Sequence, residues 1–561
     1  MFVPTTKEEL TQLGWKDKLD VIIVSGDTYI DSPNDGAAVI AKVLIRAGWK
    51  VGIIAQPDVN SSDDVTRLGE PRLFWGVTAG CVDSMVANYT ALMKKKHQDD
   101  LTPGGENNKR PDRATIVYTN LIRKYFKNTV PIILGGIEAS LRRIAHYDYW
   151  TDAIRRAVIF DAKADAILYG MGEKSILEIA KKIDLNQDWK NTRGITYISK
   201  NAPTSDFIEL PSFDEVKKDK DKFIQMFDIF YKNNDPYSAR TLIQKYNDRF
   251  LIQNPPQFLP TTEELDSYFL DFERDAHPYY AKMGKIKALE TIRFSVTSHR
   301  GCYGECNFCS ITVHQGRRIV SRSEESIINE VIEITKLPGF KGYISDIGGP
   351  TANMYQNYCK VRENKALCEK KRCAFPTVCG ALELSHKSQI ELLDKIRKIK
   401  GVKKVFIGSG IRYDLILEDK KDGSRYLRDI VEHHISGQMK IAPEHTEENV
   451  LNAMGKSHKY LIEFKREFDK LNKETNKKQF LTYYFIAAHP GCDEIHMMKL
   501  KQFLKKELRL KPEQIQIFTP TPSTYSTLMY YTEKEPFSKK TIFVEKRLKN
   551  KRNQKEIITN S

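Results

Sequence analysis

Apolar runs alternate with amphipathic, helix-like stretches along the first part of the chain. The runs that fit buried strands are residues 20–25, 51–55, 73–77, 130–134 and 164–169. Residues 37–47, between the first two runs, repeat their apolar positions at helical spacing. Strands that alternate with helices of this length predict a parallel, doubly wound sheet. We therefore expect a Rossmann-like α/β domain over residues 1–200, with any ligand near the carboxyl ends of its strands.

The next segment is polar and interrupted by proline. It contains the stretches NAPTSDF, NNDPYSAR and QNPPQFLP, and residues 214–232 fit an amphipathic helix. Proline lacks a backbone donor and fixes φ, so such stretches are typical of connections rather than of sheets. The sequence predicts a helical linker over residues 201–290.

A second alternation of strands and helices fills residues 291–525. The strands that it predicts are residues 292–297, 342–347, 404–408, 438–442, 481–487 and 514–518. This series predicts a partial (βα)6 barrel, so both domains are of the α/β class. Polar residues follow the strands, at the ends where barrel enzymes place their active sites. Among them, Arg412 fits a two-pronged clamp on a carboxylate.

Three cysteines directly follow the first barrel strand, in the stretch HRGCYGECNFC. Cys302, Cys306 and Cys309 have the spacing C-x3-C-x2-C, and thiolates this close can bind iron through sulfur. An iron–sulfur cluster usually takes four cysteine ligands, so with three of them one iron keeps an open position. The alternatives are a zinc loop and unrelated buried thiols.

The spacing, with Phe308 in the aromatic place of C-x3-C-x-aromatic-C, resembles the signature of radical S-adenosylmethionine (SAM) enzymes. The resemblance implies a [4Fe–4S] cluster on the three cysteines and SAM on its open iron. An electron from the cluster then cleaves SAM to a deoxyadenosyl radical. The resemblance further implies that Phe308 lies near the adenine, that Gly348 and Gly349 line SAM, and that Glu444 contacts the ribose hydroxyls. Pro350 stands where the superfamily's GGE motif has glutamate.

A second cysteine group lies in an insertion over residues 351–384, which we expect to cover the mouth of the barrel. The group consists of Cys359, Cys368, Cys373 and Cys379. Four cysteines in a small, loop-rich segment predict an auxiliary iron–sulfur cluster or a structural zinc, and free thiols are the alternative. The remaining Cys81 and Cys492 fit isolated buried thiols.

The first domain resembles the cobalamin-binding domain that precedes many radical SAM barrels. That domain has the motif D-x-H-x-x-G, whose histidine binds cobalt. Asp31 and Gly36 match the motif, but Pro33 occupies the position of the histidine. Since proline has no side-chain ligand, we predict against cobalamin as a cofactor. Binding without the histidine is the alternative.

Nearly the full length of the chain resembles the YgiQ family of radical SAM proteins. The stretches that carry this resemblance are VSGDTYIDSPNDGAAVI, VGIIAQP, ILGGIEASLRRIAHYDYW, SHRGCYGECNFCSI, DIGGPTANMY and MKIAPEHTEENVL. Ser32 stands where we expect a histidine in this family, which affects any role of that histidine and not the barrel chemistry. The resemblance implies no particular substrate.

The chain is basic and has no obvious membrane or export segment. Its net charge of +16 suits an acidic partner, or follows from lysines spread over solvated faces. Without a long apolar run or a signal peptide, we expect a cytoplasmic protein and no membrane partner. Residues 526–561 predict a basic, solvated tail, with a nucleic-acid arm as the alternative.

Together these features predict a radical SAM enzyme of unknown reaction. The basic insertion and tail suggest RNA or a protein as the substrate, and we expect a reductant such as flavodoxin or ferredoxin. The alternatives are a nucleic-acid-binding protein with structural metal sites and an iron–sulfur redox sensor. Three cysteines favour the enzyme, because four ligands close a structural site.

Overall fold

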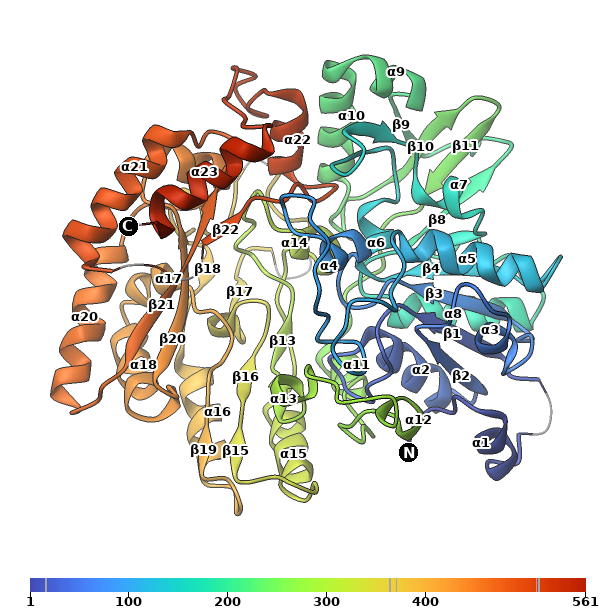
Figure 1. Cartoon of the computed structure of the whole chain (residues 1–561), viewed down its shortest axis with the longest axis horizontal. Helices are drawn as coiled ribbons and strands as arrows, with labels where there is room; N and C mark the ends of the chain where they lie inside the picture. Colours follow the sequence, from blue (N-terminus) through green and yellow to red (C-terminus); the bar gives the residue numbers. More distant parts are fainter. Residues whose placement is uncertain (16–17, 363–364, 370, 511, 513–514, 561) are drawn as a thin grey trace. The chain divides into compact units, whose positions relative to one another are not determined.

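The computed structural model describes the chain except for residues 16–17, 363–364, 370, 511, 513–514 and 561 (Figure 1). The chain forms two compact units. The first consists of Met1–Pro260 and Ser267–Arg293, and the second of Thr261–Asp266 and Phe294–Ser561.

A nine-stranded sheet organises the first unit, in the order β2-β1-β3-β4-β7-β8-β11-β10-β9. Its strands are β1 (Val21–Ser25), β2 (Val51–Ala55), β3 (Phe74–Thr78), β4 (Ile132–Gly135), β7 (Ala166–Leu168), β8 (Ile195–Ser199), β9 (Phe207–Leu210), β10 (Thr241–Tyr246) and β11 (Arg249–Gln253). The run from β2 to β7 is parallel. Since β1 and β2 are buried at every position, they are apolar throughout rather than alternating. The predicted parallel α/β domain is confirmed.

The helices of the first unit include two groups that pack together. The helices are α1 (Lys7–Gln12), α2 (Gly36–Arg46), α3 (Asp63–Thr66), α4 (Ser84–Asn88), α5 (Ala114–Tyr125), α6 (Gly136–Leu141), α7 (Val158–Ala162), α8 (Glu173–Asp184), α9 (Phe213–Lys218), α10 (Lys220–Lys232), α12 (Pro278–Ala281) and α13 (Leu289–Ile292). Helix α2 packs against α8, whereas α5 packs against α3 and α7. A small hairpin of β5 (His146–Asp148) and β6 (Ala153–Arg155) completes the unit.

The predicted linker over residues 201–290 differs from the structure. Strands β9, β10 and β11 form the edge of the nine-stranded sheet, and β11 pairs with β8 in antiparallel register. Strands β10 and β11 bury Leu242, Ile243, Leu251 and Ile252. The segment is therefore part of the first unit and not a separate connection.

Parallel strands in chain order also organise the second unit. The strands are β12 (Ser295–Thr297), β13 (His299–Arg300), β14 (Val320–Ser321), β15 (Tyr343–Ile344), β16 (Asp346–Gly348), β17 (Tyr358–Cys359), β18 (Leu382–Glu383), β19 (Lys404–Val405), β20 (Gln438–Glu444), β21 (Phe480–Ala487) and β22 (Ile515–Ile517). The parallel pairs are β12 with β16, β15 with β19, β20 with β21, and β21 with β22. A parallel bridge from Ile411 to Ile441 joins the segment after β19 to β20. Strands occur within all six predicted ranges, although Ile292 ends α13, and the six-fold size of the barrel stays a prediction.

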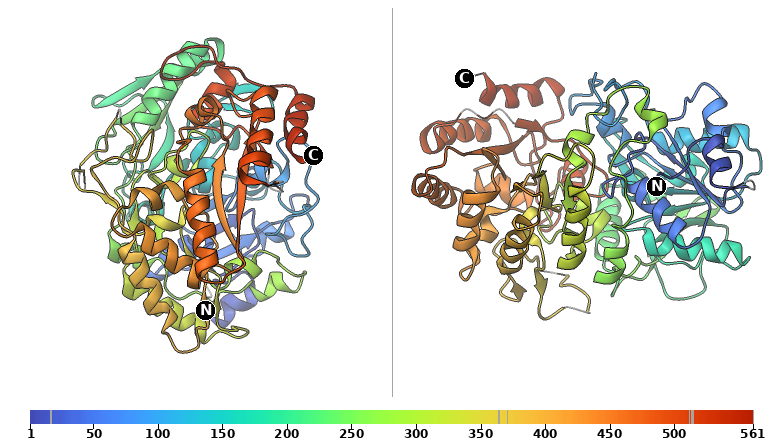
Figure 2. Two further views of the ribbon diagram at one scale, coloured as in Figure 1. Left: turned by 90° about the vertical axis from the view of Figure 1, so that its left-hand side faces the viewer. Right: turned by 90° about the horizontal axis from the view of Figure 1, so that it is seen from below.

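Helices follow these strands in turn. They are α14 (Ile311–Gln315), α15 (Glu324–Thr335), α16 (Lys387–Arg397), α17 (Tyr413–Glu418), α18 (Gly423–Asp429), α19 (Glu448–Met454), α20 (Leu461–Glu474), α21 (Glu494–Phe503), α22 (Tyr525–Thr532) and α23 (Leu548–Thr559), with the short turns η1 (Ala352–Met354), η2 (Ile430–His434) and η3 (Leu504–Leu508). Helix α11 (Thr262–Ser267) lies at the boundary of the two units. Helices α20 and α21 lie on one side of β20 and β21 (Figures 1 and 2). One apolar cluster joins these strands and helices into a core.

The predicted solvated tail over residues 526–561 is wrong for α22 and for one face of α23. Helix α22 is almost completely buried, and α23 packs against β21, β22 and α21. One face of α23 buries Lys551, Gln554 and Ile558. The ammonium of Lys551 donates to the Tyr530 hydroxyl at 2.8 Å, so the buried ammonium is hydrogen-bonded.

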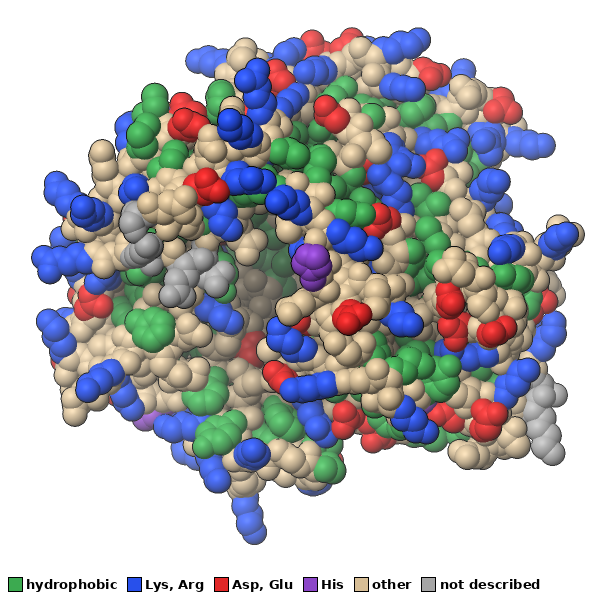
Figure 3. Space-filling model, viewed as in Figure 1, with side chains coloured by type: hydrophobic (Ala, Val, Ile, Leu, Met, Phe, Trp, Pro, Cys, Tyr) green, Lys and Arg blue, Asp and Glu red, His purple; other side chains and the backbone are tan. Residues whose placement is uncertain are grey.

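The charge of the chain is dispersed over the face drawn in Figure 3. Lys and Arg side chains stand there among Asp and Glu rather than in one basic patch. This distribution agrees with the solvated-lysine interpretation of the net charge. Within the described residues, no helix has both the length and the apolar character that a membrane crossing needs.

Candidate functional site

The three cysteines of the predicted cluster site share one loop between β13 and α14. Burial and the neighbouring Cys306 and Cys302 thiolates raise the pKa of Cys309 to about 12. Burial likewise raises the pKa of Cys302, and Cys306 adds to this shift. The thiols therefore stand within electrostatic reach of one another. The structure brings together the three residues that the spacing indicates.

Arg412 faces this loop from the segment after β19. Its Nη1 donates to Cys306 Sγ at 3.8 Å, while its Nε and Nη2 hold the two oxygens of Asp414. The guanidinium comes this close because residue 304 is glycine, whose Cβ would lie 2.6 Å from Arg412 Nη1. The predicted carboxylate clamp thus exists, but its partner in this structure is Asp414.

Glu444 ends β20 beside the cysteine loop. Its φ of 67° is unusual for a residue with a side chain, and such conformations often occur at functional sites. Its carboxylate pairs with Lys456 Nζ at 3.4 Å. Burial raises the pKa of Glu444, although Lys456 opposes this shift, and the Glu444 charge in turn acts on Cys309. Its predicted contact with SAM stays a prediction.

Gly348 and Gly349 end the second barrel strand against the base of the cysteine loop. A Cβ on Gly349 would lie 2.6 Å from the His299 ring, and one on Gly348 would lie 2.7 Å from Ser409 Oγ. The Gly348 carbonyl accepts a hydrogen bond from Ser298 Oγ at 3.0 Å. The turn therefore requires glycine for packing, and the predicted backbone contact to SAM is untested.

Two residues beside the loop were not predicted from the sequence. Thr351 Oγ1 lies 3.5 Å from Cys302 Sγ, just after the glycine pair. His489 meets the Phe308 ring edge to face, with centroids 6.3 Å apart, and accepts a hydrogen bond from Ser526 or donates one to it at 2.6 Å. Burial lowers the pKa of His489 to about 3, so the ring is neutral. Both follow strand ends, which is the signal that could have identified them.

The four cysteines of the insertion line a cavity in the second unit. Its volume is about 160 Å³, and Tyr303 and Glu305 of the cysteine loop line it too. Among the described residues, no three His, Cys, Asp or Glu side chains converge on a single metal ion. Cys81 is exposed, contrary to prediction, whereas Cys492 is buried as expected.

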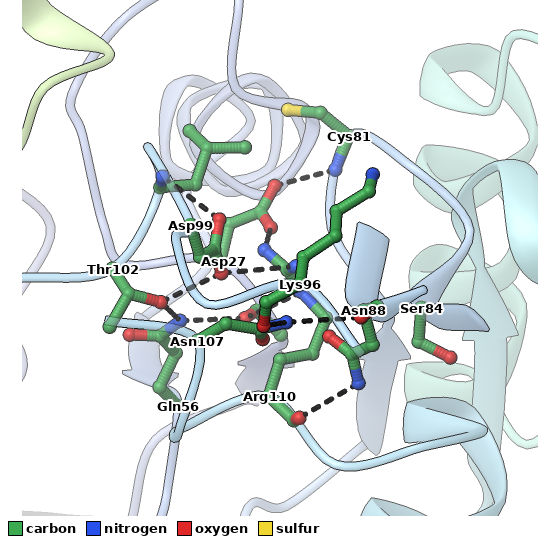
Figure 4. A network of polar contacts seen from close by, with 12 residues as sticks. Asp27, Gln56, Cys81, Ser84, Asn88, Lys96, Asp99, Thr102, Asn107 and Arg110 are labelled. Atoms are coloured by element: carbon green, nitrogen blue, oxygen red, sulfur yellow. Dashed lines mark hydrogen bonds and ion pairs between the residues drawn. The ribbon is translucent and has the colours of Figure 1, made fainter. Parts of the chain in front are cut away.

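A polar network fills the carboxyl ends of β1 and β3 in the first unit (Figure 4). Arg110 forms ion pairs with Asp27 and, at 3.1 Å, with Asp99. The second oxygen of Asp27 accepts the backbone N–H of Cys81 at 2.6 Å. Burial nevertheless raises the pKa of Asp27, and Arg110 offsets part of this shift. The crevice that the sequence predicts thus contains a network of ion pairs centred on Arg110.

The loop that resembles the cobalt-binding motif is tied into the protein. Asp31 is fully buried and pairs with Lys42 Nζ at 3.1 Å, and it accepts the Tyr29 hydroxyl at 2.8 Å. Ser32 and Pro33 follow, so the loop offers no imidazole to a metal. The side chains present fit a structural loop and supply no histidine ligand for cobalt.

The sequence is similar to proteins that cover its full length. It is 57% identical over 561 residues to a UPF0313 protein of Fusobacterium nucleatum, covering 100% of this chain and 98% of that one. It is 49% identical over 563 residues to a UPF0313 protein of Thermotoga maritima, with the same coverage. A family model for the radical SAM N-terminal region matches residues 2–295. The chain belongs to the YgiQ (UPF0313) family of radical SAM proteins.

Solved structures share the fold of this YgiQ-family chain at low identity. TsrM, a radical SAM methyltransferase from Kitasatospora setae with cobalamin and a [4Fe–4S] cluster bound, has a TM-score of 0.52 and 12% identity, covering 91% of this chain and 77% of TsrM. OxsB, a cobalamin-dependent radical SAM enzyme with aqua-cobalamin bound, has a TM-score of 0.50 and 14% identity, covering 94% of this chain and 57% of OxsB. This likeness shows the fold.

The prediction against cobalamin is wrong. It rested on one missing ligand, the imidazole that Pro33 replaces, and treated that ligand as decisive. The solved proteins that share this fold are instead cobalamin-bound radical SAM enzymes. A single position in one loop is therefore a poor guide to the cofactors of this fold.

Proposed function

We propose that this chain is a radical SAM enzyme whose cysteine loop, Cys302 to Cys309, holds a [4Fe–4S] cluster. The observation that carries the proposal is the position of three neighbouring thiols on one loop at the strand ends, with the Arg412 guanidinium beside Cys306. Family membership supports it, since the chain is a YgiQ-family protein. When bound, such a cluster supplies the electron that cleaves SAM and yields a deoxyadenosyl radical.

The residues around the loop suit an anionic cluster and a zwitterionic ligand. Arg412 donates toward Cys306 Sγ, which places a positive charge beside the proposed cluster. Glu444, Gly348 and Gly349 lie at neighbouring strand ends, where they would bind and orient SAM. Phe308 packs against His489, whose ring is neutral. Together the two rings would form an uncharged wall that excludes water from the site.

The decisive test is anaerobic reconstitution of the full chain with iron and sulfide, followed by dithionite and SAM. We expect deoxyadenosine by chromatography in the wild type and none in Cys302→Ala. Cys81→Ala is the matched control, because Cys81 lies on the first unit and is exposed. An iron-loaded chain that never cleaves SAM would favour a redox sensor. A chain that loads zinc alone would favour a nucleic-acid-binding protein with structural metal.

The first unit is proposed as a site for a corrinoid. TsrM and OxsB, which share the fold, are described with cobalamin bound. Since the loop Asp31–Pro33 offers no imidazole, this chain would hold the corrinoid by other contacts. Incubation with hydroxocobalamin, followed by gel filtration, tests this. Corrinoid absorbance that co-elutes with the protein at equal stoichiometry supports it, and protein free of that absorbance contradicts it.

The substrate and the electron donor are proposals from the sequence. A basic insertion beside the barrel suits RNA or an acidic protein surface, and flavodoxin or ferredoxin suits a one-electron reduction. Deoxyadenosine formation above the substrate-free rate, on adding RNA or protein fractions, identifies the substrate class. A cytoplasmic location stays a prediction.

A further inference from the structure

The four cysteines of the insertion come from separate turns but surround one cavity. Cys359 ends β17 and is paired opposite Leu382 of β18. Three residues before Leu382, the backbone N–H of Cys379 donates to the Cys373 carbonyl at 2.8 Å. Cys368 lines the same cavity from the intervening loop. The fold of the insertion thus gathers four thiols from separate turns around one cavity.

The cavity is larger than a single metal ion requires. Its volume is about 160 Å³, whereas about 10–15 Å³ is enough for one water molecule. A four-cysteine zinc site leaves no such space, because every sulfur lies about 2.3 Å from the ion. In a [4Fe–4S] cluster each cysteine binds a different iron, so the sulfurs surround a volume instead of meeting at a point.

The charge around the cavity suits a cluster with four thiolates, which is anionic. The basic residues that line it are Arg317, Arg362, Lys371 and Arg372. Glu305 is an acidic residue on the same wall and pairs with Arg317 at 3.3 Å. The basic side chains outnumber the acidic one on the cavity wall, so the lining suits an anionic occupant.

The cavity shares a wall with the cysteine loop. Arg372, next to Cys373, donates to the Glu305 carbonyl at 3.1 Å and to Asn307 Oδ1 at 2.7 Å. Cys302 and Cys373 also pack against the same small apolar cluster, which contains Tyr303 and Leu415. A cluster in the cavity would therefore neighbour the first one.

We propose that Cys359, Cys368, Cys373 and Cys379 bind a second iron–sulfur cluster of the [4Fe–4S] type. Four cysteines close its coordination, so this cluster has no open iron and does not bind SAM. The four thiols release their protons on binding, and the iron and sulfide enter from solution. The proposal goes beyond the SAM-cleaving function, because it holds whether or not the first site cleaves SAM.

Iron counting on two complementary variants tests the proposal. One variant carries Cys302→Ser, Cys306→Ser and Cys309→Ser, and the other carries Cys→Ser at all four positions of the insertion. After anaerobic reconstitution of the full chain, we expect about eight iron atoms in the wild type and about four in each variant. Cys81→Ser is the control and should keep the wild-type count.

Spectroscopy of the triple variant separates the two sites. Reduced with dithionite, it should show a cluster signal in electron paramagnetic resonance that SAM leaves unchanged, because every iron has a cysteine. Loss of all iron from this variant, with a circular dichroism spectrum like that of the wild type, would overturn the proposal. Zinc at one atom per chain, or two disulfides by thiol titration, would overturn it as well. The triple variant keeps all four cysteines of the insertion, so its iron content and spectrum test the proposal even if the quadruple variant fails to fold.

Discussion

The strand ends of the two units hold different chemistry. In the first unit, one guanidinium, that of Arg110, forms ion pairs with two carboxylates, those of Asp27 and Asp99. In the second unit, the Cys306 thiol of the cysteine loop accepts from a guanidinium that Asp414 already holds. The first centre is built from charged groups, whereas the second is built mainly from thiols.

The two centres differ in the charge that they carry without a bound ligand. Buried ion pairs stay charged, and loss of one partner leaves an uncompensated charge. Thiols whose pKa is raised, such as that of Cys309 at about 12, stay protonated and neutral until a metal replaces the proton. A site made of thiols can therefore fold first and load its metal later.

Arg110→Ala should have the largest effect on the first centre. It leaves Asp27 and Asp99 without their shared cation, at a cost of about 3–5 kcal/mol in the free energy of unfolding. Arg123→Ala is the matched control, because its pair with Asp165 is partly exposed and contributes about 0–1 kcal/mol. Chemical denaturation followed by circular dichroism measures both. Equal losses in the free energy of unfolding for the two variants would mean that the Arg110 network contributes no more stability than a partly exposed ion pair.

Arg412→Gln tests the second centre. The variant loses the charge beside Cys306, and a residue that supports metal ligands typically changes metal affinity by about 10–100-fold. We expect faster iron loss to a chelator and, because Asp414 loses its buried partner, a lower thermal midpoint as well. Arg425→Gln, on the exposed face of α18, should match the wild type. If iron loss from Arg412→Gln also matches the wild type, Arg412 has no part in the site.

Asp35 makes the stability of the first unit depend on pH. Burial, with the nearby Asp27 charge, raises the pKa of Asp35 from 3.8 to about 7. The folded chain therefore keeps a proton that the unfolded chain releases, so this stabilisation is present below about pH 4 and lost as pH rises through 7. The slope is at most about 1.4 kcal/mol per pH unit. Asp35→Asn should remove this decline, measured as thermal midpoints from pH 4 to 8. A decline equal to that of the wild type would contradict the assignment.

His489 makes the stability of the second unit depend on pH with the opposite sign. Its pKa falls from 6.5 to about 3 on burial, so the unfolded chain binds the extra proton. Its stabilisation is present above about pH 6.5 and is lost as pH falls toward 3, again with a slope of at most about 1.4 kcal/mol per pH unit. His489→Gln should flatten thermal midpoints between pH 6.5 and 4. His458→Gln, which is exposed, should leave them unchanged.

Uniformly buried elements could be predicted from the sequence, and mixed ones could not. The strand over residues 51–55 is apolar at every position and has the predicted bounds. Strands β10 and β11 were missed although Asn247 and Asp248 form a turn between alternating residues, which is a hairpin signal. Helix α23 was missed because its buried face contains Lys551 and Gln554, which hydrophobicity alone does not detect.

The residues of the candidate site could likewise be predicted only where they are close in sequence. Spacing alone indicated Cys302, Cys306 and Cys309, because they are close in sequence. The approach of Arg412 to Cys306 depends on a Gly304 that lets two segments meet, and only the folded chain shows it. The cofactor prediction for the first unit failed for a related reason, since a fold can bind a ligand without one particular side chain.

Helix α23 also sets an order of events during synthesis. Gln554 accepts the backbone N–H of Ala488 at 2.9 Å and donates to the Cys492 carbonyl at 3.2 Å. The ribosome makes residue 554 well after residues 488 and 492, so these backbone groups have no such partner while the nascent chain grows. The end of β21 therefore reaches its final form only after α23 has been translated.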